Sequence, residues 1–304
     1  MHKRSKLISA LLLACLAVLP RIAAQDAGSA PAKSALFWKA SSAKNTVYLL
    51  GSIHFGSKSM YPLPREVEDA FESSAALAVE VDINHVDMLK TQALLLERGL
   101  YPGDDVLWNH IGKETRLQIE QFCSTNGIPS AGLAKMRPWM VEIMTAAIWM
   151  AKNMDPELGI DKHFLDKAEK ASVKKRVVEI ESAEWQLKLL SSFPEDVQEQ
   201  ALAASMEESA QMPEMIRRME QVWMSGNADR LEKLIGEYSR GPEPVRKAML
   251  QDRNPHMADV VEQLLNGKER VFVVVGAAHL VGKDGVIAIL EKRGYKVEQV
   301  SLKR

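Results

Sequence analysis

The sequence contains very little cysteine. Only Cys15 and Cys123 occur among 304 residues, and Cys15 lies in a leader that we expect to be removed. A single remaining thiol cannot form an intramolecular disulfide, so the fold must depend on packing. Cys123 stands beside Phe122 in a predicted helix, where a buried, inert thiol is a simpler explanation than a nucleophile.

The chain also lacks an excess of charge of either sign. Lys and Arg number 39 against 40 for Asp and Glu, which gives a formal net charge of -1. Because this balance creates no field that would gather a polyanion, we expect no nucleic-acid partner. After residue 24 no apolar run reaches the roughly 18 to 20 residues that cross a bilayer, so a multi-pass membrane protein is excluded.

Residues 1–24 have the features of a secretory signal peptide. A basic start precedes the apolar segment Leu7–Leu19, and small residues stand before the expected cleavage site after Ala24. We therefore predict export to the periplasm or the medium, with residues 25–35 as a small-residue linker. The alternative is a lipoprotein signal, in which acylation of Cys15 anchors the protein to a membrane.

Residues 36–304 are predicted to form an α/β domain. The stretches "LFWKA" and "TVYLLGSI" predict a β-hairpin, and further strands are expected over 76–83, 175–181, 270–276 and 295–302. Several are apolar on both faces, which is typical of a mainly parallel sheet covered by helices on both sides. Helical periodicity over about 84–265 predicts a large helical subdomain, inserted beside a sheet that is built from both chain ends.

Two G-x-x-H motifs follow apolar strands. Gly51 precedes His54 in "LLGSIH", and Gly276 precedes His279 in "VVVGAAH". Ligands bind at the carboxyl ends of strands in open α/β sheets, and glycine permits a sharp turn there. A single such motif is weak, because a lone histidine at a strand end is more often structural. If the two strands are parallel neighbours, however, His54 and His279 converge.

Other common signatures are missing from the sequence. It has no H-E-x-x-H, no C-x-x-C, no G-x-S-x-G elbow and no G-x-x-x-x-G-K loop. A catalytic or metal site must therefore be assembled from distant segments.

Two acids stand in or beside apolar strands. Glu80 lies in "ALAVEVDI" and Glu181 ends "RVVEIE". Burial of an ionised carboxylate is costly unless a partner or a metal opposes its charge. Two neutral imidazoles with one or two carboxylates suit Mn, Fe, Co or Zn and leave coordination positions for water. The competing explanation keeps the acids in water at an edge strand and the histidines structural.

The segment "QDRNPHM" begins a predicted helix. Asn254 is expected to cap that helix and Pro255 to occupy its first turn. Arg253 has no such local explanation. A fixed guanidinium near a metal-bound water would stabilise an anionic tetrahedral intermediate, so Arg253 is a candidate for that role.

Several segments together resemble the TraB/GumN family, the bacterial relatives of the animal TIKI metalloproteases directed at Wnt proteins. The likeness runs from about Leu36 to Val300 and rests on "VYLLGSIHFGSKSMYPLPREVEDAF", "LAVEVD", "RPWM", "DPELGIDKHFL", "VVEIESAEWQLKLL", "QDRNPHM" and "VFVVVGAAHLVGKDGVIAILEKRGYKVEQV". It implies a scaffold similar to the erythromycin-esterase and ChaN folds, with a metal site between two G-x-x-H motifs. It also implies peptidase or related hydrolase activity in some members.

By this likeness His54 and His279 are the paired histidines, Glu80 is their acidic partner, and Arg253 and Asn254 are polar residues of the site. The resemblance places three more residues in family motifs without fixing their roles: Gly159, Asp161 and Glu181.

The leading hypothesis is an exported metal-dependent hydrolase that acts on peptides or small molecules. His54, His279 and Glu80 would hold a divalent ion (Mn, Co, Zn or Fe) that polarises a carbonyl and activates water, with Glu181 as the base. The alternative is a non-catalytic periplasmic protein that sequesters a peptide, haem or metal in the same pocket, aided by Met-rich helices. None of these patterns determines the oligomeric state.

Overall fold

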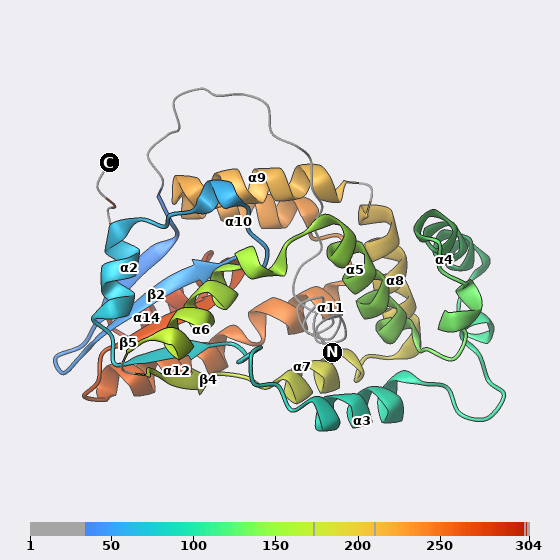
Figure 1. Ribbon diagram of the computed structural model, residues 1–304, viewed down its shortest axis with the longest axis horizontal. Helices are drawn as coiled ribbons and strands as arrows, with labels where there is room; N and C mark the ends of the chain where they lie inside the picture. The colour runs from blue at the N-terminus through green and yellow to red at the C-terminus, as the bar shows by residue number, and fades with distance from the viewer. Residues whose placement is uncertain (1–33, 173, 210, 301, 303–304) are drawn as a thin grey trace.

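A six-stranded sheet forms the centre of the molecule, with the strand order β4-β3-β5-β2-β1-β6 (Figure 1). The computed structural model describes residues 34–172, 174–209, 211–300 and 302. The predicted signal peptide, with Cys15, and the linker up to residue 33 lie outside the described residues. The strands are β1 (Phe37–Ser41), β2 (Thr46–Ser52), β3 (Ala76–Val79), β4 (Arg176–Glu179), β5 (Val271–Gly276) and β6 (Lys296–Gln299).

The sheet is mixed but mainly parallel. Strands β4, β3, β5 and β2 are parallel neighbours in that order, and β1 pairs antiparallel with both β2 and β6. The predicted hairpin and the predicted sheet from both chain ends are therefore confirmed. β3 ends at Val79, four residues before its predicted end, because the chain turns there and Glu80 reaches across to the end of β5.

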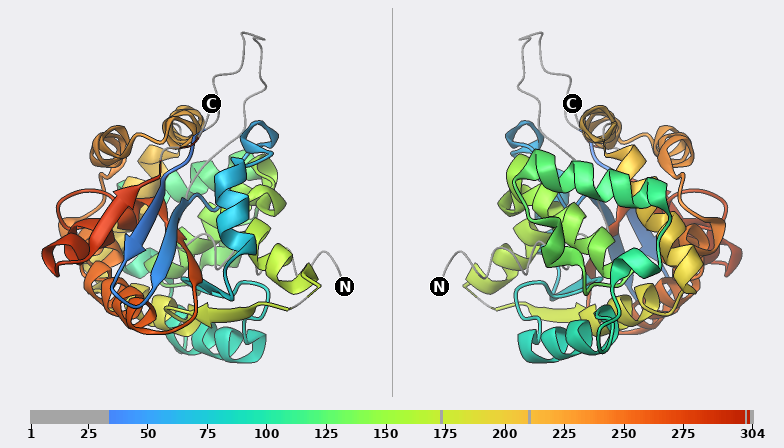
Figure 2. Two further views of the ribbon diagram at one scale, coloured as in Figure 1. Left: turned by 90° about the vertical axis from the view of Figure 1, so that its left-hand side faces the viewer. Right: turned by 90° about the vertical axis from the view of Figure 1, so that its right-hand side faces the viewer.

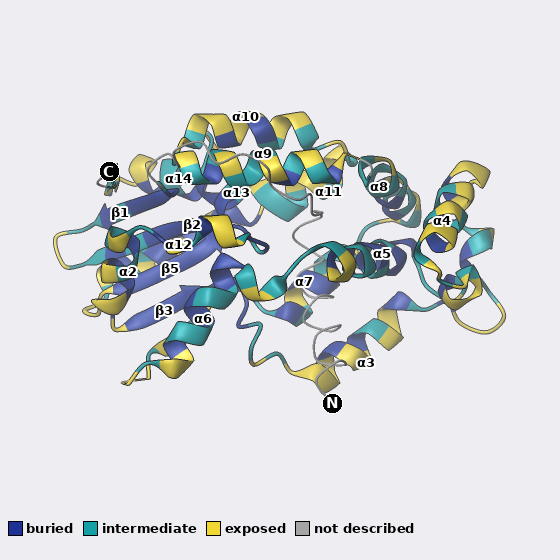
Figure 3. Cartoon of the chain, turned by 45° about the horizontal axis from the view of Figure 1, so that its top comes forward, coloured by how far each residue is buried: buried dark blue, intermediate teal, exposed yellow. Residues whose placement is uncertain are grey.

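Helices cover both faces of the sheet. α2 (Arg65–Glu72) and α6 (Ile160–Lys170) pack on one face, and α12 (Asn254–Asn266) and α14 (Val286–Lys292) lie on the other (Figure 2). This double cover explains the continuous apolar run of β5, in which Val271 to Val275 are all buried (Figure 3). On the α2 and α6 face, the ring of Phe272 lies 4.8 Å from that of Phe164 and 5.7 Å from that of Phe71.

A second group of helices lies beyond the end of the sheet (Figure 1). Its members are α3 (Met88–Gly99), α4 (Lys113–Asn126), α5 (Pro138–Asn153), α7 (Ala183–Leu190) and α8 (Glu195–Glu208). They bury apolar clusters of their own, around Trp139 and Ile143 and around Leu107 and Cys123. The thiol of Cys123 is free and buried, and burial raises its pKa, as expected for an inert core residue. The division of residues 84–265 into an inserted subdomain stays a prediction.

A third group of helices lies along the carboxyl edge of the parallel strands. It consists of α9 (Met212–Ser225), α10 (Ala228–Tyr238), α11 (Glu243–Arg246) and the π-helical turn η5 (Lys247–Gln251). The Trp223 indole nitrogen donates a hydrogen bond of 2.6 Å to the carbonyl of Gly51, which fixes α9 against β2. This group therefore covers the sheet edge at which both histidine motifs occur.

Short helices complete the structure. They are η1 (Lys58–Met60), η2 (Leu107–Asn109), η3 (Ser130–Leu133), η4 (Pro156–Leu158) and α13 (Ala277–Leu280). Within the described part of the chain, every helix is too short or too polar to span a bilayer.

Candidate functional site

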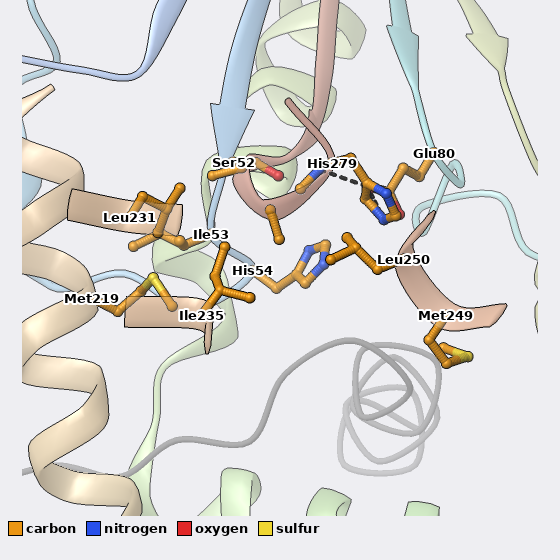
Figure 4. Close-up of a pocket in the computed structure, with 13 residues that line it drawn as sticks. Ser52, Ile53, His54, Glu80, Met219, Leu231, Ile235, Met249, Leu250 and His279 are labelled. Carbon is orange, nitrogen blue, oxygen red and sulfur yellow. Dashed lines mark hydrogen bonds and ion pairs between the residues drawn. The ribbon is translucent and has the colours of Figure 1, made fainter. Parts of the chain in front are cut away.

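Residues from three neighbouring strand ends meet at one cavity. Ser52 at the end of β2 pairs in parallel register with Gly276 at the end of β5. His54 follows Ser52 in a loop, His279 lies in α13 directly after β5, and Glu80 directly follows β3. All three side chains line the same cavity of about 260 Å³ (Figure 4).

Asp161 of α6 holds the ring of His54. Its Oδ2 atom lies 2.8 Å from Nδ1 of His54, and its Oδ1 atom accepts a hydrogen bond of 2.8 Å from the Ser52 hydroxyl. Because a carboxylate only accepts, Nδ1 of His54 carries the hydrogen and Nε2 is the other, free ring nitrogen. The family likeness marked Asp161 without giving it a role, and the sequence offered no sign that Ser52 supports it.

Asn254 holds the ring of His279 in the same way. Its amide nitrogen donates to the carbonyl of Asp284 over 2.8 Å, so its oxygen faces His279 and lies 2.7 Å from Nδ1. The expected capping role of Asn254 was wrong, because its side chain makes no cap hydrogen bond and the residue is already the first of α12. In both histidines, therefore, Nδ1 contacts the supporting side chain, and Nε2 is the ring nitrogen that does not.

Glu80 is buried and fixed at both oxygens. Its Oε1 accepts from the Gly276 amide over 2.5 Å, and its Oε2 accepts from the Arg253 guanidinium over 2.9 Å. Burial alone would raise the pKa of Glu80, but His279 when protonated and the permanent charge of Arg253 hold it at about 2. Glu80 is therefore ionised, and its Oε1 lies 3.9 Å from Nε2 of His279.

Arg253 and Glu181 form a support behind Glu80. The guanidinium makes two hydrogen bonds to Glu181, of 2.9 and 2.7 Å, and a third of 2.8 Å to the carbonyl of Met249. Gln186 of α7 donates to Oε2 of Glu181, the oxygen that also accepts the shorter bond from Arg253. Neither Arg253 nor Glu181 lines the cavity, so the structure places both behind Glu80 rather than beside a substrate. Arg253 forms an ion pair with Glu80 and so supplies the opposing charge that a buried carboxylate needs.

The two histidines differ in proton affinity. Burial lowers the pKa of His279 to about 4, so its ring is neutral near pH 7. Burial also acts to lower the pKa of His54, but the carboxylates of Asp161 and Glu80 outweigh it and raise that pKa above the usual value. The neutral ring of His279 can offer the lone pair of Nε2 to a metal ion directly. At His54 a metal ion would first have to displace a proton.

The donor atoms at the cavity fit a divalent metal in kind. Support of Nδ1 by a side-chain oxygen, with Nε2 as the donor, is the usual arrangement of histidine ligands. Glu80 adds an ionised carboxylate at the same cavity. In the ranges that the structure describes, no group of three or more His, Cys, Asp or Glu side chains is placed so that it could hold a metal ion. The residues at the cavity therefore match a metal site in the type of donor atom but are not arranged as one.

Two glycines permit close contacts at the site, where a side chain would not fit. A β-carbon on Gly159 would overlap the carbonyl oxygen of His54. A β-carbon on Gly276 would lie 3.1 Å from Oε1 of Glu80, closer than an ordinary contact. Gly159 is thus needed for the close approach of the backbone before α6 to the His54 loop, which explains why it occurs beside Asp161.

The other histidines in the described part of the chain lie away from the cavity. His85 and His256 are exposed. His110 and His163 are half-buried instead. His110 is held between two carboxylates, and His163 bonds Glu68 over 3.1 Å. Packing against other helices buries them, which the polar residues around them in the sequence do not predict.

Comparisons with known proteins agree on one family. A family model described as the TraB/PrgY/gumN family matches residues 36–299. The chain is 25% identical over 244 residues to the "Uncharacterized protein YbaP" of Escherichia coli, which covers 80% of this chain and 87% of that protein. It is 21% identical over 276 residues to an "Uncharacterized protein" of Treponema pallidum, covering 86% and 81% of the two chains. No solved structure gives a significant match.

Proposed function

Since the chain belongs to the TraB/PrgY/gumN family and directs two supported histidines and an ionised carboxylate at one cavity, we propose that it is a metal-dependent hydrolase that cleaves peptide bonds. The observation that carries this proposal is the matched support of the two rings. Nδ1 of His54 is held by Asp161 and Nδ1 of His279 by Asn254. Both contacts favour Nε2 as a metal-binding atom.

In this proposal His54, His279 and Glu80 hold a divalent ion of Mn, Co, Zn or Fe. When bound, the ion would polarise the carbonyl of the scissile bond and lower the pKa of water. The overall reaction adds the hydroxyl of one water to the acyl carbon and its hydrogen to the leaving amine. The cavity wall beside these residues is apolar, which keeps bulk water from screening the charges.

The remaining polar residues act through these three. Arg253 holds Glu80 in one orientation and neutralises part of the buried charge. Glu181, itself bonded by Gln186, holds Arg253, so we replace the expected role of Glu181 as a base with that of a positioning residue. For the same reason Arg253 is proposed to position Glu80, and Asn254 to position His279.

We extend the proposal to scaffold and location. Parallel strands that end in site residues support a scaffold similar to the erythromycin-esterase and ChaN folds, with residues 84–265 as a helical insertion. The basic, apolar and small-residue segments of residues 1–24 support export after cleavage at Ala24. An intact mass that begins at Gln25 would support this site, and a diacylglycerol adduct on Cys15 would favour the anchored lipoprotein instead.

A second candidate is a non-catalytic periplasmic protein that sequesters a peptide, haem or metal. The apolar wall with Met219 and Met249 supports it, because thioether side chains adapt to ligands of irregular shape. Turnover separates this candidate from the hydrolase.

The test of the proposal combines metal analysis with a cleavage screen. Protein purified from the periplasm is analysed for metals and incubated with a peptide library, with and without chelator. Chelator-sensitive cleavage and about one ion per chain are expected, and His279→Ala should lose both. The exposed His256→Ala is the matched control and should keep both. A metal-loaded protein without any cleavage would favour the binding protein, and cleavage that is unaffected by chelator and by His279→Ala would refute the metal-dependent site.

A further inference from the structure

A second cavity adjoins the one at the histidines. The second cavity, of about 190 Å³, shares Ile235, Leu250 and Ala278 with the first. Ile235 belongs to α10, Leu250 to η5 and Ala278 to α13. The two cavities therefore lie next to each other and form the two parts of a cleft between these helices.

The two parts of the cleft differ in chemistry. In the first, the polar side chains come from the strand-edge segments, and the opposite wall is formed by Met219, Leu231 and Ile235. Figure 4 shows these three grouped on one side of His54, with Glu80 on the other. The second part is the more polar of the two, because the charged residues Glu232, Lys283 and Asp284 also line it.

The junction between the two parts lies next to the supported histidine. Ala278 lines both cavities and directly precedes His279. Asn254, which holds the His279 ring, lines the second cavity. A ligand that occupies both parts must therefore pass His279, with one end against an apolar wall and the other among charged groups.

We infer that the site takes an extended oligopeptide, with one aliphatic or methionine-sized side chain seated against Met219, Leu231 and Ile235. The rest of the peptide continues past Ala278 into the second cavity. This inference rests on the proposed hydrolase and names its substrate class. The apolar wall supplies the preference for the side chain, and the polar second cavity accepts a backbone whose amides need hydrogen-bonding surroundings.

Two substitutions separate the two parts of the cleft. Met219→Gln keeps the length of the side chain but makes the first cavity polar. Its matched control is Met215→Gln, one turn earlier on α9 and half-buried, which lines neither cavity. Gly236→Leu fills the second cavity, because a β-carbon at Gly236 has no atom within 4 Å.

The control for Gly236→Leu is Gly132→Leu in η3, which also has open space around a new β-carbon. Neither glycine has a left-handed backbone, so both variants are expected to fold. Circular dichroism and thermal unfolding check this for all four proteins.

The experiment compares peptides that differ at one residue. A peptide of the library, chosen by cleavage or by binding, is synthesised with Leu, Gly or Asp at the residue expected in the first cavity. Cleavage rates are measured on the metal-loaded protein. Binding is measured separately by calorimetry on His279→Ala, in which cleavage is expected to be lost.

We expect the leucine peptide to exceed the glycine peptide by about tenfold in kcat/KM and in affinity, as is usual for one apolar side chain in a pocket. Met219→Gln should remove that difference, and Gly236→Leu should weaken all three peptides by about tenfold. The two control variants should behave as the parent.

The outcomes of the two measurements are distinguishable. A leucine preference in binding that depends on Met219, without any cleavage, supports the cleft inference and contradicts the hydrolase. Cleavage with equal rates for Leu, Gly and Asp supports the hydrolase and overturns the inference. Neither binding nor cleavage of any peptide, or no effect of Met219→Gln and Gly236→Leu, also overturns it.

Discussion

The side-chain oxygen of Asn254 lies 2.7 Å from Nδ1 of His279. This contact joins the start of α12 to α13, and the two residues are 25 positions apart in sequence. It gives His279 the same kind of support that Asp161 gives His54. The pair of supported rings is the structural basis of the predictions below.

The two histidines should behave as one unit in metal binding. We expect His54→Ala and His279→Ala each to lose most of the bound metal, because the loss of one ligand opens the site. The double variant should lose little more, since ligands of a shared ion are strongly non-additive. Metal content and chelator-sensitive hydrolysis measure this, with circular dichroism as the check on folding. Independent, additive losses would contradict a shared ion.

Removal of the charge on Asp161 should weaken metal binding without unfolding the protein. Asp161→Asn keeps the size of the side chain but weakens the support of Nδ1 in His54. A loss of about 10-fold to 100-fold in metal affinity is expected, the usual effect of such a supporting partner. Asp166→Asn, on the same helix α6 and away from the cavity, is the control. Equal metal affinities for the two variants would show that Asp161 does not support a ligand.

Loss of Arg253 should destabilise the whole domain. Arg253→Met leaves the buried carboxylates of Glu80 and Glu181 without their counter-charge. We expect the free energy of unfolding to fall by about 3–5 kcal/mol, the typical cost of breaking a buried ion pair. Denaturant unfolding measures it, and the exposed Arg246→Met is the control.

Two further substitutions test whether the unpaired charges cause the loss of stability in Arg253→Met. When Glu80→Gln and Glu181→Gln are added to Arg253→Met, no buried charge is left without a partner, and much of the lost stability should return. If the triple variant is less stable than Arg253→Met alone, packing and not charge explains the role of Arg253.

Glu142 on α5 should make stability depend on pH. Burial, and then the nearby charge of Glu208 on α8, raises the pKa of Glu142 from 4.5 to about 7. The folded state therefore binds this proton more tightly than the unfolded state, and stability falls as pH rises from about 4.5 to about 7. Above that range the loss is complete, and below it both states are protonated.

Glu142→Gln should remove this dependence. Its Tm at pH 8 is expected to rise by several degrees, because one pKa unit corresponds to about 1.4 kcal/mol and 1 kcal/mol shifts Tm by roughly 2–4 °C. At pH 4 the variant and the parent should be nearly equal. The exposed Glu114→Gln serves as control. An equal rise at both pH values would point to packing instead of ionisation.

Several elements could be predicted because they depend on local pattern. The hairpin of β1 and β2 and the apolar strands β3 and β5 were visible in the alternation and continuity of apolar residues. The two G-x-x-H motifs could be assigned to strand ends for the same reason. Burial of Cys123 followed from its apolar neighbours.

The roles of supporting residues could not be predicted in this way. Asn254 satisfies the local rule for a helix cap, yet its oxygen bonds the His279 ring. Glu181 satisfies the rule for a candidate base, yet Arg253 and Gln186 occupy its oxygens behind the cavity. In both cases the side chain bonds a residue that is distant in sequence and so does not take the role that its local sequence predicts.

The sequence by itself therefore determined the α/β class, the family and the positions of His54, His279 and Glu80 at strand ends, because strand periodicity and motif order are local properties. Only the tertiary structure decided that β2, β5 and β3 are neighbours with these residues at one edge. It also decided that Asp161, Asn254 and Arg253 hold them. Those contacts join residues up to 173 positions apart, and hydrogen bonds over such separations depend on how the sheet and helices pack, which no local pattern encodes.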